Sequence, residues 1–182
     1  FLTPIRQWGR FKNRNNLNGS KRNILAHYDI SNDFYKLILD DRMQYSSGIY
    51  LQETTTLSEA QTEKLKRICD QLELKATDHL LEIGSGWGGL AIFAATHYGC
   101  RVTTTTISDA QYEEAEQRIH AAGLSHKITL LKQDYRTLDG QYDKLVSIEM
   151  IEAVGHEFLP DYFKRLGRLL RPGGKLLLQA IT

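Results

Sequence analysis

The fold is decided by residues 79–90, HLLEIGSGWGGL. Residues 79–85 are a short apolar run that leads into glycines, which predicts a buried strand. The following GGLAIFAATHYG predicts a buried helix that stops at Gly99, since glycine commonly ends helices. A strand, a glycine loop and a helix in this order are typical of nucleotide-binding α/β folds, in which the backbone comes close to a ligand.

Outward from that stretch, helical and strand patterns alternate from about Thr56 to Thr182. Thr56 and Glu59 form a capping box that opens a helix over TLSEAQTEKLKRICDQLEL. Helices are also predicted over SDAQYEEAEQRIHAAG and LPDYFKRLGRLL, the second stopped by RPGG. The other strands are predicted over residues 101–108, 127–134, 142–150 and 175–182. Five strands separated by helices predict an α/β fold with a doubly wound, mostly parallel, Rossmann-like sheet.

The first 55 residues lack this alternation. HYDISNDFYKLILDD predicts a short aromatic-rich helix, and RMQYSSGIY predicts a loop. We therefore divide the chain into an N-terminal helical extension or lid, residues 1–55, and a Rossmann-like core, residues 56–182. We expect the extension to cover the carboxyl ends of the strands, where open α/β sheets bind ligands. Residues at or near those ends are Glu82, Gly84, Ser108, Asp134, Glu149 and Glu152.

The glycine loop is compatible with two cofactors. Gly84, Gly86 and Gly89 match the dinucleotide pattern GxGxxG, but a dinucleotide site also needs an acid at the end of the next strand. That strand ends in TTTTIS, which contains no acid. The spacing Glu82-x-Gly84-x-Gly86-x-Gly88 matches the glycine loop of S-adenosylmethionine (SAM) methyltransferases, which favours SAM over a nicotinamide cofactor. A third interpretation is that the glycines serve only the packing of helix on strand.

Charge is nearly balanced over the whole chain, but the N-terminal segment is basic. The net charge is +1, so the whole chain shows no preference for a charged partner. Residues 1–26 hold six Lys or Arg and no Asp or Glu, which predicts either contact with an anionic surface, lipid or nucleic acid, or a solvated arm. Cys69 and Cys100 lack CxxC spacing, which fits a reducing compartment. No metal-ligand spacing, signal peptide or membrane span is found.

In series, the motifs resemble the family of cyclopropane-fatty-acyl-phospholipid synthases and mycolic acid cyclopropane synthases, from about Asn23 to Thr182. The motifs that carry the resemblance are HYDISNDFY, MQYSSGIY, LEIGSGWGGL, TTISDAQ, QDYRTL and SIEMIEAVGHE. The resemblance implies a SAM-dependent enzyme that adds a methylene group to the cis double bond of a phospholipid acyl chain, with bicarbonate as proton acceptor. It also implies a cytoplasmic protein, peripheral at the inner membrane face, that contacts the phospholipid bilayer surface and no nucleic acid. A homodimer is left open.

The resemblance also assigns cofactor contacts. It implies that Tyr45 and Ser46 contact the methionine end of SAM and that Gly84 and Gly86 line its backbone. Further contacts would come from Glu82, from Trp87, from Thr106 and Gln111 in place of a ribose acid, and from Asp134 and Tyr135 at the adenine. Local alternatives are that Gln111 closes a capping box with Ser108, that Asp134 caps a turn, and that Trp87 packs in the core.

For the bicarbonate site the resemblance points to Glu152, Ser47, Gln179 and Ile181. Ser47 and Gln179 stand where better-known members have Cys and His. Both keep a hydrogen-bond donor, but Gln cannot titrate. We expect Glu152 to accept the O–H of bicarbonate and Glu149 to have a structural role. Because both Ser47 and Gln179 differ from the residues of better-known members, methyl transfer without ring closure is an alternative reaction.

Three other functions remain open from the sequence. They are a SAM methyltransferase acting on a small amine, a nicotinamide-dependent oxidoreductase and a non-catalytic SAM-binding module. Methyltransferase sheets of this kind usually close with two further strands after the last strand predicted here. We therefore expect this chain to be a fragment that binds SAM and does not form cyclopropane alone.

Overall fold

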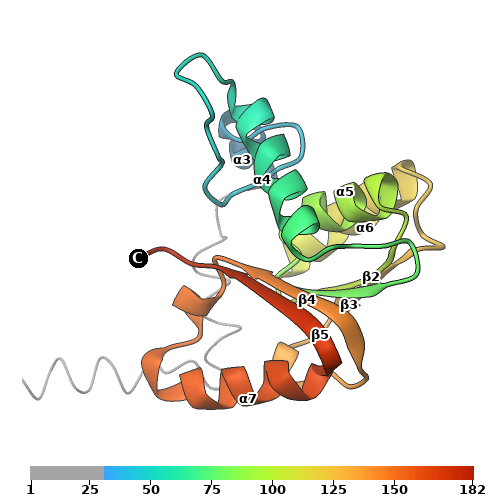
Figure 1. Ribbon diagram of the computed structural model, residues 1–182. Coiled ribbons are helices and arrows are strands. Elements are labelled where there is room, and N and C mark those ends of the chain that lie inside the picture. Colours follow the sequence, from blue (N-terminus) through green and yellow to red (C-terminus); the bar gives the residue numbers. More distant parts are fainter. Residues whose placement is uncertain (1–30) are drawn as a thin grey trace, which may run out of the picture.

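The computed structural model describes residues 31–182 (Figure 1). The basic segment predicted to meet an anionic surface lies outside these residues. At the centre of the described part is a five-stranded parallel sheet with the strand order β3-β2-β1-β4-β5. The prediction of a doubly wound, parallel α/β fold is confirmed. The strands are β1 (His79–Ile83), β2 (Arg101–Thr106), β3 (Ile128–Lys132), β4 (Tyr142–Ile148) and β5 (Leu170–Gln179).

Strand β5 starts five residues earlier than expected, and RPGG does not act as a helix stop. The preceding helix already ends at Leu169, because Leu170 adopts an extended conformation. Pairing with β4 then jumps from Tyr142↔Leu170 to Lys144↔Lys175, so residues 171–174 form an irregularity within the strand. Gly173 has a φ of 78°, a conformation that glycine adopts without strain.

Helices cover both faces of the sheet (Figure 1). One face carries α4 (Leu57–Gln71), α5 (Gly89–His97) and α6 (Asp109–Ala121), and the other carries α7 (Leu159–Leu169). The capping box of Thr56 and Glu59 is present at the start of α4. Separate apolar clusters fill the two sides, and both cysteines are free thiols buried in the first cluster. Short 3₁₀ turns follow β3 and β4: η1 (Tyr135–Thr137), η2 (Ile151–Ala153) and η3 (His156–Phe158).

The short helix α3 (Asn32–Ile38) lies against the glycine loop and α6. Asn32 Oδ1 accepts a hydrogen bond of 2.9 Å from Trp87 Nε1, and the rings of Tyr35 and Trp87 are 4.9 Å apart. Lys36 forms an ion pair of 3.1 Å with Glu114 of α6. These contacts place α3 at the carboxyl edge of the sheet. Among residues 31–182, no helix has the length and apolar character needed to cross a membrane.

Candidate cofactor cavity and carboxylate cluster

A cavity of about 1110 Å³ opens at the carboxyl edge of the sheet. Its volume is close to the upper end of the ~300–1,000 Å³ that is usual for small-molecule sites, so it can hold an organic cofactor. Ser47, Glu152 and Ile181 line the cavity, whereas Gln179 is not part of its lining. The lining also includes every residue that the sequence assigned to the cofactor: Tyr45, Ser46, Glu82, Gly84, Gly86, Trp87, Thr106, Gln111, Asp134 and Tyr135.

The glycine loop presents bare backbone to this cavity. Gly84 and Gly86 have φ angles of 94° and 49°, in the left-handed region that favours glycine. The backbone N–H groups of Gly84 and Ser85 both donate to Thr105 O on β2, which fixes the loop. A Cβ added to Gly86 would meet no atom within 4 Å. The space beside Gly86 is therefore available to a ligand.

Glu82 is a buried acid at the end of β1. It is 4% exposed, and its Oε2 accepts a hydrogen bond of 2.6 Å from Thr104 Oγ1 on the neighbouring strand. Burial raises the pKa of Glu82 to about 8, and the hydrogen bond from Thr104 offsets only part of this effect. At neutral pH the carboxyl group is mostly protonated and can donate a hydrogen bond into the cavity.

Thr106 and Gln111 are joined at the start of α6. Thr106 Oγ1 donates to Gln111 Oε1 at 2.9 Å and accepts from Ser108 N at 3.1 Å. Ser108 Oγ caps the helix by accepting from Gln111 N at 3.3 Å. The reciprocal bond of a capping box is not formed, because the Gln111 side chain is turned to Thr106. This arrangement holds the Gln111 carboxamide at the cavity wall, where a ribose hydroxyl could meet it.

Asp134 has the capping role that was considered as the alternative to adenine binding. Its Oδ1 accepts from Arg136 N at 2.9 Å and from Arg136 Nε at 2.8 Å, and its Oδ2 accepts from Arg136 Nη2 at 2.6 Å. The carboxylate begins η1 in this way. Each carboxylate oxygen has two lone pairs, so acceptance from an adenine amine is still compatible with the cap. Tyr135 lies beside it, with its ring 5.3 Å from that of Tyr162.

Trp87 packs in the core, as one interpretation expected, and its position is also compatible with a cofactor contact. It is 1% exposed and packs with Tyr35 and Met43, yet it lines the cavity. Tyr35 also contacts Tyr45, with ring centroids 5.2 Å apart. The stack from Trp87 through Tyr35 to Tyr45 connects the glycine loop to the loop that follows α3.

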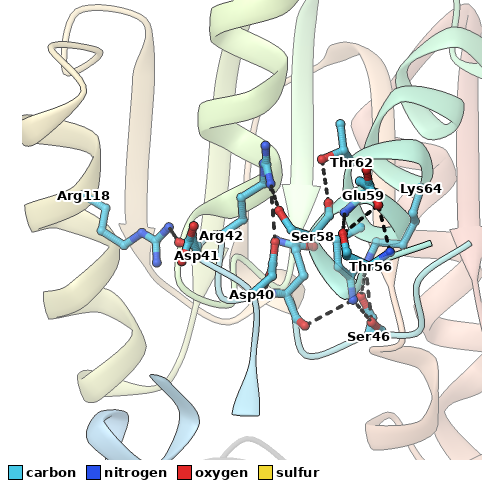
Figure 2. Close-up of polar contacts among 12 residues, drawn as sticks. Asp40, Asp41, Arg42, Ser46, Thr56, Ser58, Glu59, Thr62, Lys64 and Arg118 are labelled. Atoms are coloured by element: carbon cyan, nitrogen blue, oxygen red, sulfur yellow. Dashed lines mark hydrogen bonds and ion pairs between the residues drawn. The ribbon is translucent and has the colours of Figure 1, made fainter. Parts of the chain in front are cut away.

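Two residues of α4 that sequence reasoning missed hold Ser46. Lys64 Nζ donates to Ser46 Oγ at 2.6 Å (Figure 2), and Gln61 Nε2 donates to Ser46 O at 2.8 Å. Lys64 is 1% exposed, and burial lowers its pKa to about 8 although the charges of Glu149 and Asp40 oppose the shift. The available signal was a Lys and a Gln on the apolar face of the predicted helix.

A carboxylate cluster lies at the ends of β4 and β5. Glu149 Oε1 accepts two hydrogen bonds, from Ser47 N at 3.0 Å and from Gln179 Nε2 at 2.8 Å. Gln179 Nε2 also donates to Ser47 O at 3.3 Å. Glu152 Oε1 accepts a hydrogen bond of 2.6 Å from Ile181 N. The four residues assigned to bicarbonate thus form two pairs: Ser47 and Gln179 are bridged by Glu149, and Glu152 binds Ile181.

No group of three His, Cys, Asp or Glu side chains within residues 31–182 is placed to hold a metal ion. The cavity offers backbone groups, carboxyls, hydroxyls and aromatic rings. Such a lining suits an organic cofactor with both polar and apolar parts.

The strand order and the glycine loop define a Rossmann-like fold of the SAM methyltransferase type. The chain belongs to the mycolic acid cyclopropane synthetase family, whose model matches residues 15–182. The resemblance inferred from the motifs is therefore confirmed.

Three known proteins illustrate the relationship. The tuberculostearic acid methyltransferase UfaA1 of Mycobacterium tuberculosis is 45% identical over 90% of this chain and 40% of its own length. The cyclopropane-fatty-acyl-phospholipid synthase of Escherichia coli K12 is 42% identical over 91% of this chain and 43% of its own. The crystal structure of mycolic acid cyclopropane synthase CmaA1, complexed with SAH and CTAB, superposes with a TM-score of 0.82, 32% identity and coverage of 87% and 55%. The chain thus spans about two fifths of the length of these curated relatives.

Proposed function

We propose that the protein carrying this chain is a SAM-dependent methyltransferase that alkylates the cis double bond of a membrane lipid acyl chain. The observation that carries the proposal is the single cavity that gathers all ten residues assigned to SAM beside the bare backbone of Gly84 and Gly86. Membership of the mycolic acid cyclopropane synthetase family supports it. SAM supplies a methyl group on a sulfonium sulfur, which the electron pair of an alkene can attack.

The chain's own residues bind and orient the cofactor. Ser46, held by Lys64 and Gln61, meets the methionine end beside Tyr45. Gln111, held by Thr106, takes the ribose hydroxyls that an acid binds in dinucleotide sites. Asp134 and Tyr135 lie at the adenine end, and protonated Glu82 donates from beneath the glycine loop. Further contacts to Gly84, Gly86 and Trp87 complete the wall.

The exposed apolar side chains at the cavity mouth support the proposal of an apolar substrate. Ile38, Tyr45 and Tyr50 line the cavity and remain about half exposed. Leu37 and Leu51 lie close to them in the chain and are more exposed, at 82% and 63%. A rim of this kind suits an acyl chain that leaves a bilayer, and both curated relatives are named for acyl-chain products.

The residues assigned to bicarbonate do not fit that ion as they are arranged. Ser47 N and Gln179 Nε2 already donate to Glu149, and Ile181 N donates to Glu152. An added anion would meet two carboxylates, and among residues 31–182 the Ser47 hydroxyl is the one side-chain donor of this set that makes no hydrogen bond. Like-charge repulsion from Glu149 and Glu152 therefore disfavours the ion. No step of the reaction is therefore assigned to bicarbonate.

This altered cluster supports a second product beside the cyclopropane ring. Loss of a proton from the transferred methyl group closes the ring, whereas loss of a proton from a chain carbon next to the cation leaves a methyl-bearing alkene. Both outcomes need only a proton acceptor. The ring is the first expectation from the Escherichia coli relative, and the open-chain product is the expectation from UfaA1.

Two measurements test the proposed function. Calorimetry should show binding of SAM and no binding of NADH, and the reverse would reject the methyltransferase assignment. Mass spectrometry of lipids from cells expressing the full-length protein that carries this chain should show a gain of one CH₂. A product without a double bond is the cyclopropane, and a product that keeps one is the open-chain form. Unchanged lipids would reject the acyl substrate in favour of another acceptor.

We also propose a peripheral position at the bilayer surface on the cytoplasmic side. The basic character of residues 1–26 supports attraction to anionic headgroups, and the exposed apolar mouth supports access to acyl chains. Binding to vesicles should rise with the fraction of anionic lipid and fall with salt. Binding that ignores anionic lipid would contradict a role for the basic segment.

A further inference from the structure

We propose that the Glu149 carboxylate fills the anion site of this cluster and is itself the proton acceptor of the reaction. The inference rests on the proposed function and adds to it the residue that removes the proton.

The first argument is the convergence of donors on one oxygen. Ser47 N and Gln179 Nε2 approach Glu149 Oε1 at 3.0 and 2.8 Å. The two donors come from the loop after α3 and from the end of β5, 132 positions apart in the chain. Two N–H groups aimed at a single oxygen are the geometry of an anion site. In this protein a side chain of the same fold supplies the anion.

The second argument is the backbone of Glu149. Its φ is 48°, a left-handed conformation that is uncommon for a residue other than Gly, Asn or Asp. Such a conformation costs about 1–3 kcal/mol and tends to occur at functional sites. The hydrogen bond of 2.8 Å from Glu149 N to Gln179 O holds the backbone there. The conformation aims the carboxylate at Ser47 N and into the cavity lining.

The third argument is that one carboxylate oxygen remains for chemistry. Within residues 31–182, the hydrogen bonds to Glu149 all end on Oε1, and Oε2 receives none. The buried Lys64 lies near enough for the charge of Glu149 to raise the Lys64 pKa against the effect of burial. Glu152 differs, because it is exposed and its Oε1 holds the backbone N–H of Ile181. Glu152 is thereby a positioning residue for the end of β5.

The reaction balances with these groups. The alkene π electrons form a bond to the methyl carbon, the carbon–sulfur bond breaks, and its electron pair stays on sulfur as S-adenosylhomocysteine (SAH) is released. The second alkene carbon is left as a carbocation. Glu149 Oε2 takes a proton from the transferred methyl group, and the C–H electron pair closes the ring, or takes it from a neighbouring carbon to form a double bond. No oxidant or reductant is consumed.

A purely structural role for Glu149 is the competing interpretation, and two variants separate the roles. Glu149→Gln keeps an oxygen that accepts from Ser47 N but removes the basicity. Glu149→Gly relieves the positive φ and empties the anion site, so folding should be preserved. Both are made in the full-length protein that carries this chain, and SAM binding is measured in each by calorimetry.

We expect wild-type turnover to be unaffected by removal of bicarbonate. Glu149→Gln should bind SAM within about threefold of wild type and lose about 10²–10⁴ in turnover, the usual contribution of a general base. Glu149→Gly should be as slow without bicarbonate and recover at least about tenfold when bicarbonate is added, with saturation. Glu152→Gln should keep bicarbonate-independent turnover well above that of Glu149→Gln.

Carbon-13 NMR of labelled bicarbonate gives a readout that needs no turnover. Labelled bicarbonate should bind Glu149→Gly and not the wild type. Turnover of Glu149→Gln equal to wild type, bicarbonate-dependent wild-type turnover, or bicarbonate binding to the wild type would each overturn the inference. If the wild type alkylates no unsaturated acyl chain, the proposed function fails. The labelled titration then still decides whether Glu149 fills the anion site.

Discussion

The two ends of the cavity are built in different ways. Around the glycine loop, the wall comes from consecutive residues at strand ends, and its hydrogen bonds run between neighbouring strands, as from Thr104 to Glu82. At the carboxylate cluster, the wall comes from Ser47, Glu149 and Gln179, which lie on three segments far apart in the chain. The first end shares its glycine-loop pattern with other nucleotide-binding folds, whereas the second end depends on contacts between distant segments.

The two ends should therefore respond differently to substitution. The glycine loop requires particular φ angles at Gly84 and Gly86, so few residues are tolerated there. The cluster is held by the side chains of Glu149 and Gln179 and by the backbone of Ser47, and none of these contacts requires a glycine. We therefore expect changes at the glycine-loop end to alter cofactor binding and stability, and changes at the cluster to alter turnover.

The largest effect is expected from Glu82→Gln, measured as stability against pH. The folded-state pKa of Glu82 is about 8 against an ordinary value of 4.5, so the folded state retains a proton that the unfolded state loses. The free energy of unfolding should fall as pH rises from about 4.5 to about 8, by roughly 4 kcal/mol. Chemical denaturation of Glu82→Gln should show a flatter profile across this window. If the free energy of unfolding changed with pH equally in the wild type and in Glu82→Gln, the buried Glu82 carboxyl would not be the cause of the pH dependence.

Next in size is the effect of Gly86→Ala on SAM binding. The added Cβ enters space that is open in the cavity, and we expect SAM affinity to fall at least about 30-fold, roughly 2 kcal/mol. Gly123→Ala is a matched control, because Gly123 also has a positive φ, 69°, and no atom within 4 Å of the added Cβ, but lies at the far end of α6. Both variants should lose similar stability. Equal SAM affinity in the two would place the cofactor elsewhere.

The smallest effect is expected from Lys64→Met. Lys64 binds Ser46 at the cofactor wall and lies near the charge of Glu149 in the carboxylate cluster. Loss of the hydrogen bond to Ser46 Oγ should weaken SAM binding about fivefold, roughly 1 kcal/mol. Thermal stability should not fall, since the variant no longer buries an ammonium group. The control is Lys66→Met on the same helix, whose ammonium is exposed and paired with Asp70. Weakening by both variants alike would point to a general charge effect.

The structural features that depend on residues close together in the chain could be predicted from the sequence. The capping box of Thr56 and Glu59, the glycine loop and the five parallel strands follow from local patterns, and the structure confirms them. The RPGG segment was misassigned, since Leu170 turns into the sheet before the proline is reached and the glycines are accommodated by the strand irregularity.

The cluster could not be predicted from spacing alone. Glu149 meets Ser47 across 102 positions and Gln179 across 30, so no periodicity connects them. Family resemblance brought Ser47, Gln179 and Glu152 together but assigned Glu149 only a structural role. Lys64 and Gln61 escaped notice for the same reason, because Ser46 becomes their neighbour only when the loop after α3 folds over α4.

The most direct test is a crystal structure of the full-length protein that carries this chain, grown with SAH and excess bicarbonate. We predict that the adenine lies at Asp134 and Tyr135, the amino acid end at Ser46, and that Glu149 Oε1 still accepts from Ser47 N and Gln179 Nε2. A bicarbonate ion bound to these two donors, with Glu149 turned away, would contradict the assignment of Glu149. SAH bound away from Gly84 and Gly86 would contradict the cofactor site as well.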